Sequence, residues 1–337
     1  MKYKSVVVTR RGGPEVLQIM ENDLRPPSAG EARIKILATP VVQDDIAVRV
    51  GNRPFLAKIP FTPGYSILGV VDALGDQKQT ASAGSAIVKV GDRVAALTTF
   101  GGYAEYIYWN ADQLVKVPAN LDPAEAVVLI LNYLTAYQVL HRVAQVKPGD
   151  KALIIGASGG VGTAFLQLGK LADLKMYGLA SPNKHSALAE YGATPIDYHR
   201  QDLVEVIRQA EPAGIDFVFN GMGEEYFGRG LAVLRRGGVL VHYGGPQSFA
   251  RFLLLVGKLI LYNLLPNGKT IKGYGTHTGD VNQFKDEWEK LFMLLEEGRI
   301  KPIISKKFPI LEAAKANELL ESGQVTGNIV LLAPELL

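Results

Sequence analysis

The sequence predicts an α/β protein in which a doubly wound parallel sheet is inserted into a mostly antiparallel β domain. About the first 120 residues carry short β-branched or alternating runs between Gly and Pro turns. From about Asn132 strands alternate with helical stretches, which is typical of a parallel sheet. The chain has 337 residues and is 47% apolar, enough for two cores. The predicted domains are therefore 1–130 plus 276–337, and 131–275.

The β domain is expected to be discontinuous in the chain. Its first part carries strand-like runs at residues 5–8, 32–38, 68–74 and 104–109. Beyond the second domain come a helix-like stretch, 281–297, and a strand-rich tail ending NIVLLAPELL. Because that tail needs strands to pair with, we expect it to join the first part.

The inserted domain is expected to contain a nucleotide-binding turn. Its predicted strands are residues 151–155, 175–179, 194–196, 216–219, 239–242 and 270–274. The first strand runs into a turn with Gly159, Gly160 and Gly162, followed by a helix whose apolar residues share one face. Such glycines let the backbone approach a pyrophosphate, and the helix N-terminus favours its negative charge. A tight turn without a ligand is the alternative interpretation.

The end of the second strand indicates which dinucleotide binds. A carboxylate there would hold a ribose 2′-hydroxyl and reject a 2′-phosphate, yet the segment LASPNKH has none. It offers Ser181 and Lys184 instead, and the next strand ends at Tyr198. Charge-assisted hydrogen bonds to a phosphate contribute roughly 1.5–3 kcal/mol each, so these residues favour NADP(H). A lysine that is merely solvated is the alternative.

Composition excludes several classes of function. The net charge of +3 comes from dispersed Lys and Arg, which argues against nucleic-acid binding. The chain has no Cys, so no disulfide or thiolate zinc site can form, and its five His lack ligand spacing. We therefore predict no metal. The start of the chain lacks the apolar core of a signal peptide, so a cytoplasmic protein is expected.

The longest apolar run, residues 251–266, is interrupted by Gly257, Lys258 and Asn263 and is too short to span a bilayer. Three interpretations stay open: a lid over a substrate pocket, part of a subunit interface, or a surface that touches lipid. A lid or an interface is favoured, because burial stabilises each Leu or Ile by roughly 1.5–3 kcal/mol. No transmembrane segment is expected, although peripheral membrane contact is compatible with this run.

Four segments resemble the zinc-free quinone oxidoreductases of the medium-chain dehydrogenase/reductase superfamily. They are VGDRVAAL (90–97), GGYAEY (101–106), LTAYQVL (134–140) and VKPGDKALIIGASGGVG (146–162). Within that family, NYLTAY (132–137), the Lys184–His185 pair, PIDYH (195–199) and the insert around NLLPNG (263–268) look closest to the vesicle amine transport protein homologue branch.

The resemblance implies a GroES-like β-barrel catalytic domain, a Rossmann domain, a cofactor between them and a homodimer. Carried over by position, Thr135 and Gly244 would lie near the nicotinamide, and Ser181, Lys184 and Tyr198 near the adenosine phosphate. The remaining positions expected to bind the cofactor are Ser158, Gly159, Gly160, Val161, Asn220, Gly221, Gly223 and Asn328, the last replacing a common Lys.

Departures from the family pattern fall on the predicted substrate pocket. Val42 stands where relatives commonly carry an Asn that faces substrate, and Arg53 where a Tyr is common. The resemblance further suggests Tyr65, Asn132 and Tyr133 as pocket residues and candidate proton donors. No single catalytic residue is assigned.

The resulting hypothesis is an NADPH-dependent oxidoreductase that delivers hydride to a small hydrophobic electrophile, a quinone or an α,β-unsaturated carbonyl compound, without metal. Two alternatives stay open. One is a catalytically weak NADP(H)-binding protein with a sensing or membrane-surface role. The other is a reductase of enoyl thioesters.

Overall fold

The computed structural model describes residues 1–53, 56–76, 88–245, 248–276 and 281–337. Two compact units divide the chain: Met1–Leu134 with Gly279–Leu337, and Thr135–Thr278. The boundaries expected from the sequence lie after residues 130 and 275. The second unit is thus an insertion between the two parts of the first.

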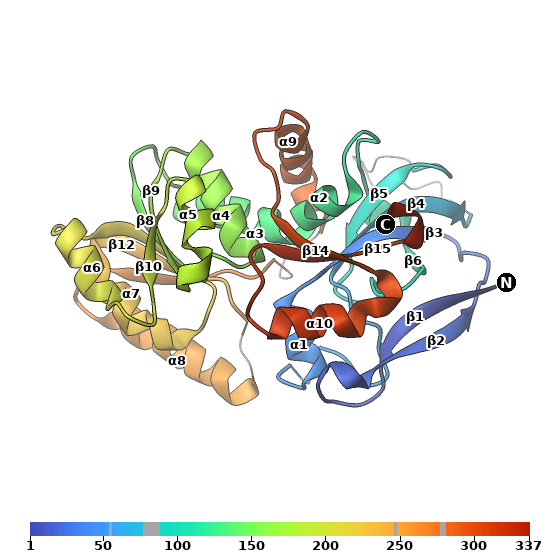
Figure 1. The fold of residues 1–337 in the computed structure, drawn as a ribbon, viewed down its shortest axis with the longest axis horizontal. Coiled ribbons are helices and arrows are strands. Elements are labelled where there is room, and N and C mark those ends of the chain that lie inside the picture. The colour runs from blue at the N-terminus through green and yellow to red at the C-terminus, as the bar shows by residue number, and fades with distance from the viewer. Residues whose placement is uncertain (54–55, 77–87, 246–247, 277–280) are drawn as a thin grey trace. The chain divides into compact units, whose positions relative to one another are not determined.

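Unit 1 is built on a seven-stranded sheet and a two-stranded hairpin (Figure 1). The seven-stranded sheet has the order β14-β15-β3-β4-β5-β7, with β6 also paired to β3, and only β14 and β15 are parallel neighbours. The strands are β1 (Lys2–Val8), β2 (Leu17–Asp23), β3 (Glu31–Val41), β4 (Ser66–Leu74), β5 (Arg93–Leu97), β6 (Tyr106–Asn110), β7 (Val115–Lys116), β14 (Ile304–Pro309) and β15 (Asn328–Leu332). The helices are α1 (Gln43–Arg49), α2 (Pro123–Val128), α9 (Lys285–Glu296) and α10 (Ala313–Glu321).

The C-terminal tail completes this sheet, as the sequence predicted. Strand β15 pairs antiparallel with β3, so that Ile329 faces Val41 and Leu332 faces Ala38. All five residues of β15 are buried, because the strand lies inside the sheet. A core made mainly of Val, Ile and Ala residues from both parts of the chain therefore forms a single cluster.

Unit 2 is a six-stranded parallel sheet of the order β10-β9-β8-β11-β12-β13, with helices on both faces. Figure 1 shows α4 and α5 on one face and α6, α7 and α8 on the other. The strands are β8 (Lys151–Ile155), β9 (Lys175–Ala180), β10 (Thr194–Asp197), β11 (Ile215–Asn220), β12 (Leu234–His242) and β13 (Thr270–Gly273). The helices are α3 (Leu134–Gln138), α4 (Gly160–Leu171), α5 (His185–Glu190), α6 (Leu203–Ala210), α7 (Phe227–Val233) and α8 (Phe249–Leu264). The predicted doubly wound sheet is confirmed.

The apolar run at 251–266 forms most of α8, which is a 16-residue helix. Its side chains Leu255, Leu259 and Tyr262 pack against the core of unit 2. The opposite side is exposed within the chain, with Ile260 57% and Leu264 76% accessible. The helix is thus apolar on both sides, although this unit covers only one of them.

A second apolar stretch escaped the sequence reasoning. The helical segment Pro123–Ala144 is long and apolar enough to cross a membrane by length and composition, but 83% of its apolar window is buried inside the protein. Such burial is typical of a core helix. It contains two π-helical stretches, Leu129–Tyr133 and Val139–Ala144, a rare geometry that is frequent at functional sites.

Candidate nucleotide site and acceptor-side residues

The parallel sheet brings the predicted cofactor residues of unit 2 to one edge. Register pairs Ile155 of β8 with Leu179 of β9 on one side and with Asn220 of β11 on the other. Asn220 in turn pairs with His242 of β12. The loops that follow these strands therefore start side by side, at the carboxyl edge where open α/β sheets bind their ligands. Because β9 and β11 flank β8, the strand order reverses here.

In the glycine turn after β8, two positions require glycine and a third has room for a side chain. Gly156 has φ +85°, a conformation that L side chains rarely adopt. A Cβ at Gly162 would lie 2.1 Å from the Gly156 carbonyl oxygen, so no larger residue fits there. At Gly159 the nearest atom to such a Cβ is 3.5 Å away, which is ordinary contact. Gly156 and Gly162 therefore shape the turn, and Gly159 leaves its outer side open.

The N-terminus of α4 is available to an anion. Gly159 is the N-cap and supplies no side-chain hydrogen bond to the helix. Thr163 N donates to Gly159 O at 2.8 Å, so intrahelical bonding begins there and the preceding amides lie before the first such bond. Unpaired amides and the helix dipole favour a phosphate at this end. Ser158, Gly160 and Val161 lie in this turn and first helical residues, as expected for pyrophosphate contacts.

Ser181 and Tyr198 directly follow the ends of β9 and β10. The last paired residues of these strands are Ala180 and Asp197, so the loops that carry Ser181 and Tyr198 start side by side. Ser181 Oγ donates to Asn183 Oδ1 at 2.8 Å. Tyr198 is exposed and its ring lies 4.1 Å, centroid to centroid, from that of His199.

Lys184 is buried in the short turn after β9, and its backbone N donates to Ser181 O at 2.9 Å. Burial lowers the pKa of its ammonium group, since the charged form loses hydration. An anion bound beside it would offset that loss.

Asp197 is the nearest carboxylate in sequence to Tyr198. It accepts a hydrogen bond from His199 N at 2.9 Å and so bonds within its own turn.

The loop after β11 is organised by its own asparagine. Asn220 Nδ2 donates to Gly223 O at 2.7 Å, and its Oδ1 accepts from Met222 N at 3.0 Å. Gly221 N donates to Ile155 O at 3.2 Å, which joins this loop to the strand before the glycine turn. Asn220 thus shapes the loop that carries Gly221 and Gly223, with both of its amide atoms engaged.

Two residues at this loop, Met222 within it and Tyr243 beside it, were not predicted from the sequence. The side chain of Met222 is 56% exposed, and its Sδ would lie 3.3 Å from a Cβ at Gly156, so it covers the start of the glycine turn. Tyr243 packs its hydroxyl against Gly221, and burial raises the pKa of this phenol. Nothing in the local sequence distinguishes these residues from ordinary packing positions.

Thr135 and Gly244 occupy the same edge of the sheet. Gly244 follows β12 by two residues, and a Cβ there would lie 3.0 Å from Gly221 O. Thr135 Oγ1 and Thr276 Oγ1 are 2.8 Å apart in a buried hydrogen bond, and Thr276 follows β13. All the predicted cofactor residues of unit 2 thus lie beyond the carboxyl ends of its strands or bond to a residue that does.

Asn328 lies in unit 1 and bonds to protein groups. Its Oδ1 accepts from Asn132 Nδ2 at 2.6 Å, and its Nδ2 donates to Ile303 O at 3.0 Å. Both amide atoms of this buried side chain are therefore engaged. Its assignment to the cofactor stays a prediction.

The predicted pocket residues of unit 1 come from two parts of the sequence. Val42, Arg53 and Tyr65 lie in or near α1 and the loop before β4, and Asn132 and Tyr133 lie in the helical segment after α2. Val42, at the N-cap of α1, is buried and cannot cap the helix with its side chain. Arg53 forms an ion pair of 2.5 Å with Asp44. Burial and the Asp44 charge raise the pKa of the buried Tyr65 phenol, while Arg53 opposes them. Asn132 and Tyr133 are buried in the π-helical stretch 129–133.

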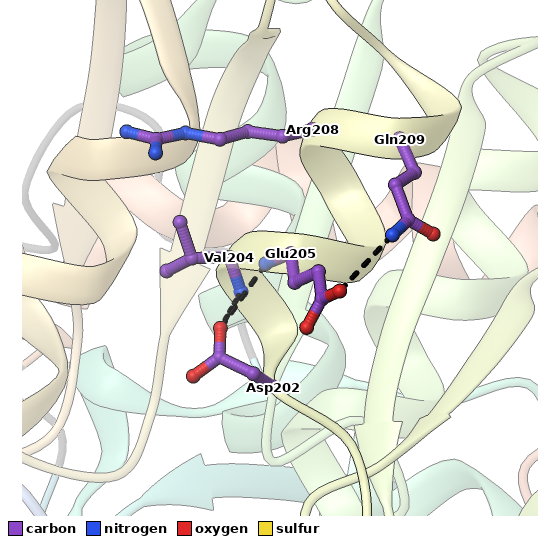
Figure 2. A pocket seen from close by; sticks show the side chains of 5 residues that line it. All are labelled: Asp202, Val204, Glu205, Arg208 and Gln209. Carbon is purple, nitrogen blue, oxygen red and sulfur yellow. Dashed lines mark hydrogen bonds between the residues drawn. The ribbon is translucent and has the colours of Figure 1, made fainter.

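Figure 2 shows a surface hollow on α6, lined by Asp202, Val204, Glu205, Arg208 and Gln209. Asp202 caps α6 by accepting from Val204 N at 2.7 Å, and Gln209 Nε2 donates to Glu205 Oε1 at 3.1 Å. Two of its polar side chains also bond outside α6, since Asp202 forms an ion pair of 3.6 Å with Arg229 and Arg208 Nη2 donates to Ala232 O at 3.4 Å. None of the predicted site residues lines this hollow.

Comparison with known proteins identifies the family. The chain matches the alcohol dehydrogenase GroES-like domain over residues 28–119 and a zinc-binding dehydrogenase domain over residues 191–331. It is 30% identical to the human synaptic vesicle membrane protein VAT-1 homolog, over 98% of this chain and 86% of that protein. The chain belongs to the quinone oxidoreductase-like medium-chain dehydrogenase/reductase superfamily. The predicted family and fold class are confirmed.

Two further relatives bear the quinone oxidoreductase name. The pig quinone oxidoreductase is 28% identical, over 97% of each chain. The crystal structure of Escherichia coli quinone oxidoreductase complexed with NADPH superposes with a TM-score of 0.83 at 26% identity, covering 98% of this chain and 99% of that one. The chain is therefore a member of an oxidoreductase family whose solved structures include an NADPH complex.

The matched family description mentions zinc, but this chain offers few metal ligands. It has no Cys, and within the residues that the structure describes no group of three or more His, Asp or Glu could hold a metal ion.

Proposed function

We propose that the protein is an NADPH-dependent reductase that delivers hydride to quinones or α,β-unsaturated carbonyl compounds without a metal. One observation carries the proposal: the carboxyl edge of the parallel sheet combines an uncapped helix N-terminus at Gly159 with a buried cation at Lys184. The helix N-terminus suits the pyrophosphate of NADPH, and the buried cation suits its 2′-phosphate. The NADPH complex of the E. coli relative supports the same cofactor.

The residues present fit the cofactor. The α4 N-terminus, with Ser158 to Val161, would hold the pyrophosphate through backbone amides. Lys184, Ser181 and Tyr198 would hold the 2′-phosphate, and a carboxylate that would repel it is missing from the end of β9. When bound, NADPH supplies the hydride, and the protein orients the partners and excludes water.

The hydride acceptor is expected to be the electrophilic carbon of a quinone or enone rather than a carbonyl group polarised by a metal. Without thiolate ligands the chain cannot assemble the Cys-containing zinc sites that polarise an alcohol. The proton that completes the reduction comes from water or from a positioned acid. Burial raises the pKa of Tyr65 and makes it a weaker acid, and Tyr133 and Asn132 are the other candidate donors that the resemblance suggests.

The experiment measures nucleotide binding and turnover on one sample. NADPH and NADH affinities are determined by quenching of protein fluorescence, and NADPH oxidation is followed with quinones, enones and an enoyl thioester. We expect tighter NADPH than NADH binding and turnover of a quinone or enone. Binding without turnover of any acceptor would support the alternative of a catalytically weak NADP(H)-binding protein. Turnover of the thioester alone would support a reductase of enoyl thioesters.

The exposed side of α8 favours a second role at a membrane surface. Residues 226–279 contain seven basic residues and no Asp or Glu: Arg229, Arg235, Arg236, Arg251, Lys258, Lys269 and Lys272. Acidic residues from other segments pair with three of them, at Arg229, Arg235 and Arg251. Arg251 and Lys258 lie on α8 itself, and an apolar helix that carries positive charge and no acidic residue is typical of helices that lie on anionic lipid. We therefore propose peripheral contact with an anionic bilayer.

Flotation with vesicles tests this role. Phosphatidylcholine vesicles with and without about 30% phosphatidylserine are compared for the wild type, the outward Ile260→Gln/Leu264→Gln variant and the exposed control Met293→Gln on α9. We expect binding to the anionic vesicles only, lost in the double variant alone. If the wild type stays free and the double variant converts a homodimer into a monomer, α8 is a subunit interface instead.

A further inference from the structure

The carboxylate of Asp45 in α1 receives hydrogen bonds from three donors while only 2% exposed. Val42 N donates to Oδ2 at 3.1 Å, Gly64 N donates to Oδ1 at 2.9 Å, and the Tyr103 hydroxyl donates to Oδ2 at 3.0 Å. These donors come from three separate segments of unit 1. One side chain thus joins the start of α1 to the loop before β4.

The two backbone donors carry predicted pocket residues. Val42 is the N-cap of α1, and Gly64 immediately precedes Tyr65. Thr98 N donates to Tyr65 O at 2.8 Å and Thr98 Oγ1 to Gly64 O at 2.9 Å, so the carbonyls of this loop are fixed from β5. Among the residues that the structure describes, Asp45 is the side chain that bonds both Val42 and Gly64.

The environment of Asp45 is short of positive charge. Burial raises its pKa to about 7, with the nearby Asp44 adding to the rise, against the hydrogen bonds from Val42, Gly64 and Tyr103. The nearest buried cation, Arg49, bonds elsewhere, at 2.6 Å to Gly12 O and 2.6 Å to Glu321 Oε1. The other polar group on this cluster is Asn317 of α10, which donates to the Tyr103 hydroxyl at 3.5 Å. Among the residues that the structure describes, no cation forms an ion pair with this carboxylate.

Protonation of this carboxyl group creates a conflict among donors. A carboxylic acid must itself donate one hydrogen, yet backbone amides cannot accept one. The proton could go to the Tyr103 oxygen, but the Tyr103 hydrogen would then lose its acceptor. Because all three neighbours are donors, the protonated form leaves at least one of them without a buried partner, which is costly.

We propose that Asp45 is a positioning residue whose ionised carboxylate holds Val42 and Tyr65 in place on the acceptor side, and whose protonation loosens them. This inference rests on the proposed function in one respect, namely that Val42 and Tyr65 face the acceptor. The control of their position follows from the hydrogen bonds alone.

The test compares wild type with Asp45→Asn at saturating NADPH, from about pH 5.5 to about pH 8.5. An Asn keeps the shape but offers one acceptor oxygen in place of two. In the wild type KM for the acceptor should rise roughly fivefold below neutrality, as expected for the loss of one hydrogen bond. In Asp45→Asn the KM for the acceptor should be raised at every pH and should not vary with pH. The NADPH affinity of both proteins should stay unchanged across this range.

Asp122→Asn is the matched control, since Asp122 is another carboxylate of unit 1 that accepts two backbone amides, at 2.7 Å from Ala124 N and 3.2 Å from Glu125 N. It should keep the wild-type profile. A pH-independent KM in the wild type, or the same pH profile in Asp45→Asn, overturns the proposal.

Amide hydrogen exchange of peptides covering residues 40–46 and 62–66 tests the positioning without turnover. After correction for intrinsic rates, wild-type exchange in both peptides should accelerate below neutrality, and Asp45→Asn should exchange fast throughout. If no acceptor is reduced but this pattern is seen, the proposed function fails and Asp45 still positions these segments. Unchanged exchange in the variant overturns the positioning itself.

Discussion

Asn132 donates a hydrogen bond of 2.6 Å from its Nδ2 to Oδ1 of Asn328, which lies 196 residues further along the chain. The orientation of this pair is determined by Ile303, whose carbonyl can only accept and therefore takes Asn328 Nδ2. Asn328 must then present its oxygen to Asn132. The tail of the chain thus sets which amide atom of Asn132 is used within the protein.

A double-mutant cycle with Asn132→Ala and Asn328→Ala should give a coupling energy of about 0.5–1.5 kcal/mol, the net contribution of one hydrogen bond. The free energy of unfolding in urea is measured by tryptophan fluorescence, which reports on unit 1 because Trp109 and Trp288 both lie there. Strict additivity of the two losses would show that the pair does not interact. NADPH affinity of Asn328→Ala on the same sample tests its predicted cofactor contact.

Lys184→Ala should weaken NADPH binding far more than NADH binding, because only NADPH carries the 2′-phosphate. Loss of one charge-assisted hydrogen bond corresponds to roughly 1.5–3 kcal/mol, or about a tenfold to hundredfold rise in the NADPH dissociation constant. Fluorescence titration with both nucleotides measures the ratio. Equal losses for NADPH and NADH would exclude a phosphate contact at Lys184.

Gly162→Ala should mainly reduce stability, whereas Gly159→Ala should mainly reduce NADPH affinity. A methyl group at Gly162 would meet backbone atoms at 2.1 and 2.6 Å, so this variant should lose several kcal/mol of stability or fail to fold. At Gly159 the closest atom is 3.5 Å away, so stability should change by about 0.5 kcal/mol or less while NADPH binds more weakly. Thermal unfolding and nucleotide titration separate the effects. Normal NADPH affinity in Gly159→Ala would argue against pyrophosphate binding there.

Glu211→Gln should destabilise unit 2 at neutral pH and lose this effect in acid. Burial opposes ionisation of Glu211, but hydrogen bonds from Lys151, Lys175 and Tyr177 overcome it and hold its pKa at about 2. A depressed folded-state pKa contributes stability above the unfolded value of 4.5, which is lost as pH falls through about 2.

Since Lys151 and Lys175 are partly exposed, at 34% and 56%, we expect a loss of only about 1–3 kcal/mol at pH 7. Urea unfolding followed by circular dichroism measures it, because neither Trp lies in unit 2. A difference between variant and wild type that stays constant as the solution is acidified would contradict the assignment.

Local sequence patterns were sufficient to predict those features that depend on residues adjacent in the sequence. The strand at Lys151–Ile155 and the glycine turn after it were predicted correctly, because a short apolar run and the spacing of glycines are patterns of a few residues. Met222 and Tyr243 were missed since their roles come from loops that the sheet register brings beside Gly156 and Gly221. No spacing in the sequence encodes that proximity.

Periodicity, motifs and composition were enough to predict the fold class, the inserted parallel sheet, the family and the lack of thiolate ligands. The folded chain adds that Asn328 orients Asn132, that Asp45 joins Val42 to Gly64, and that α8 packs against the core with one of its two apolar sides. These features were not predictable, because most of the residues that they join lie far apart in the sequence. Hydrogen bonds and burial between residues far apart depend on how the strands pair, which the local pattern leaves undetermined.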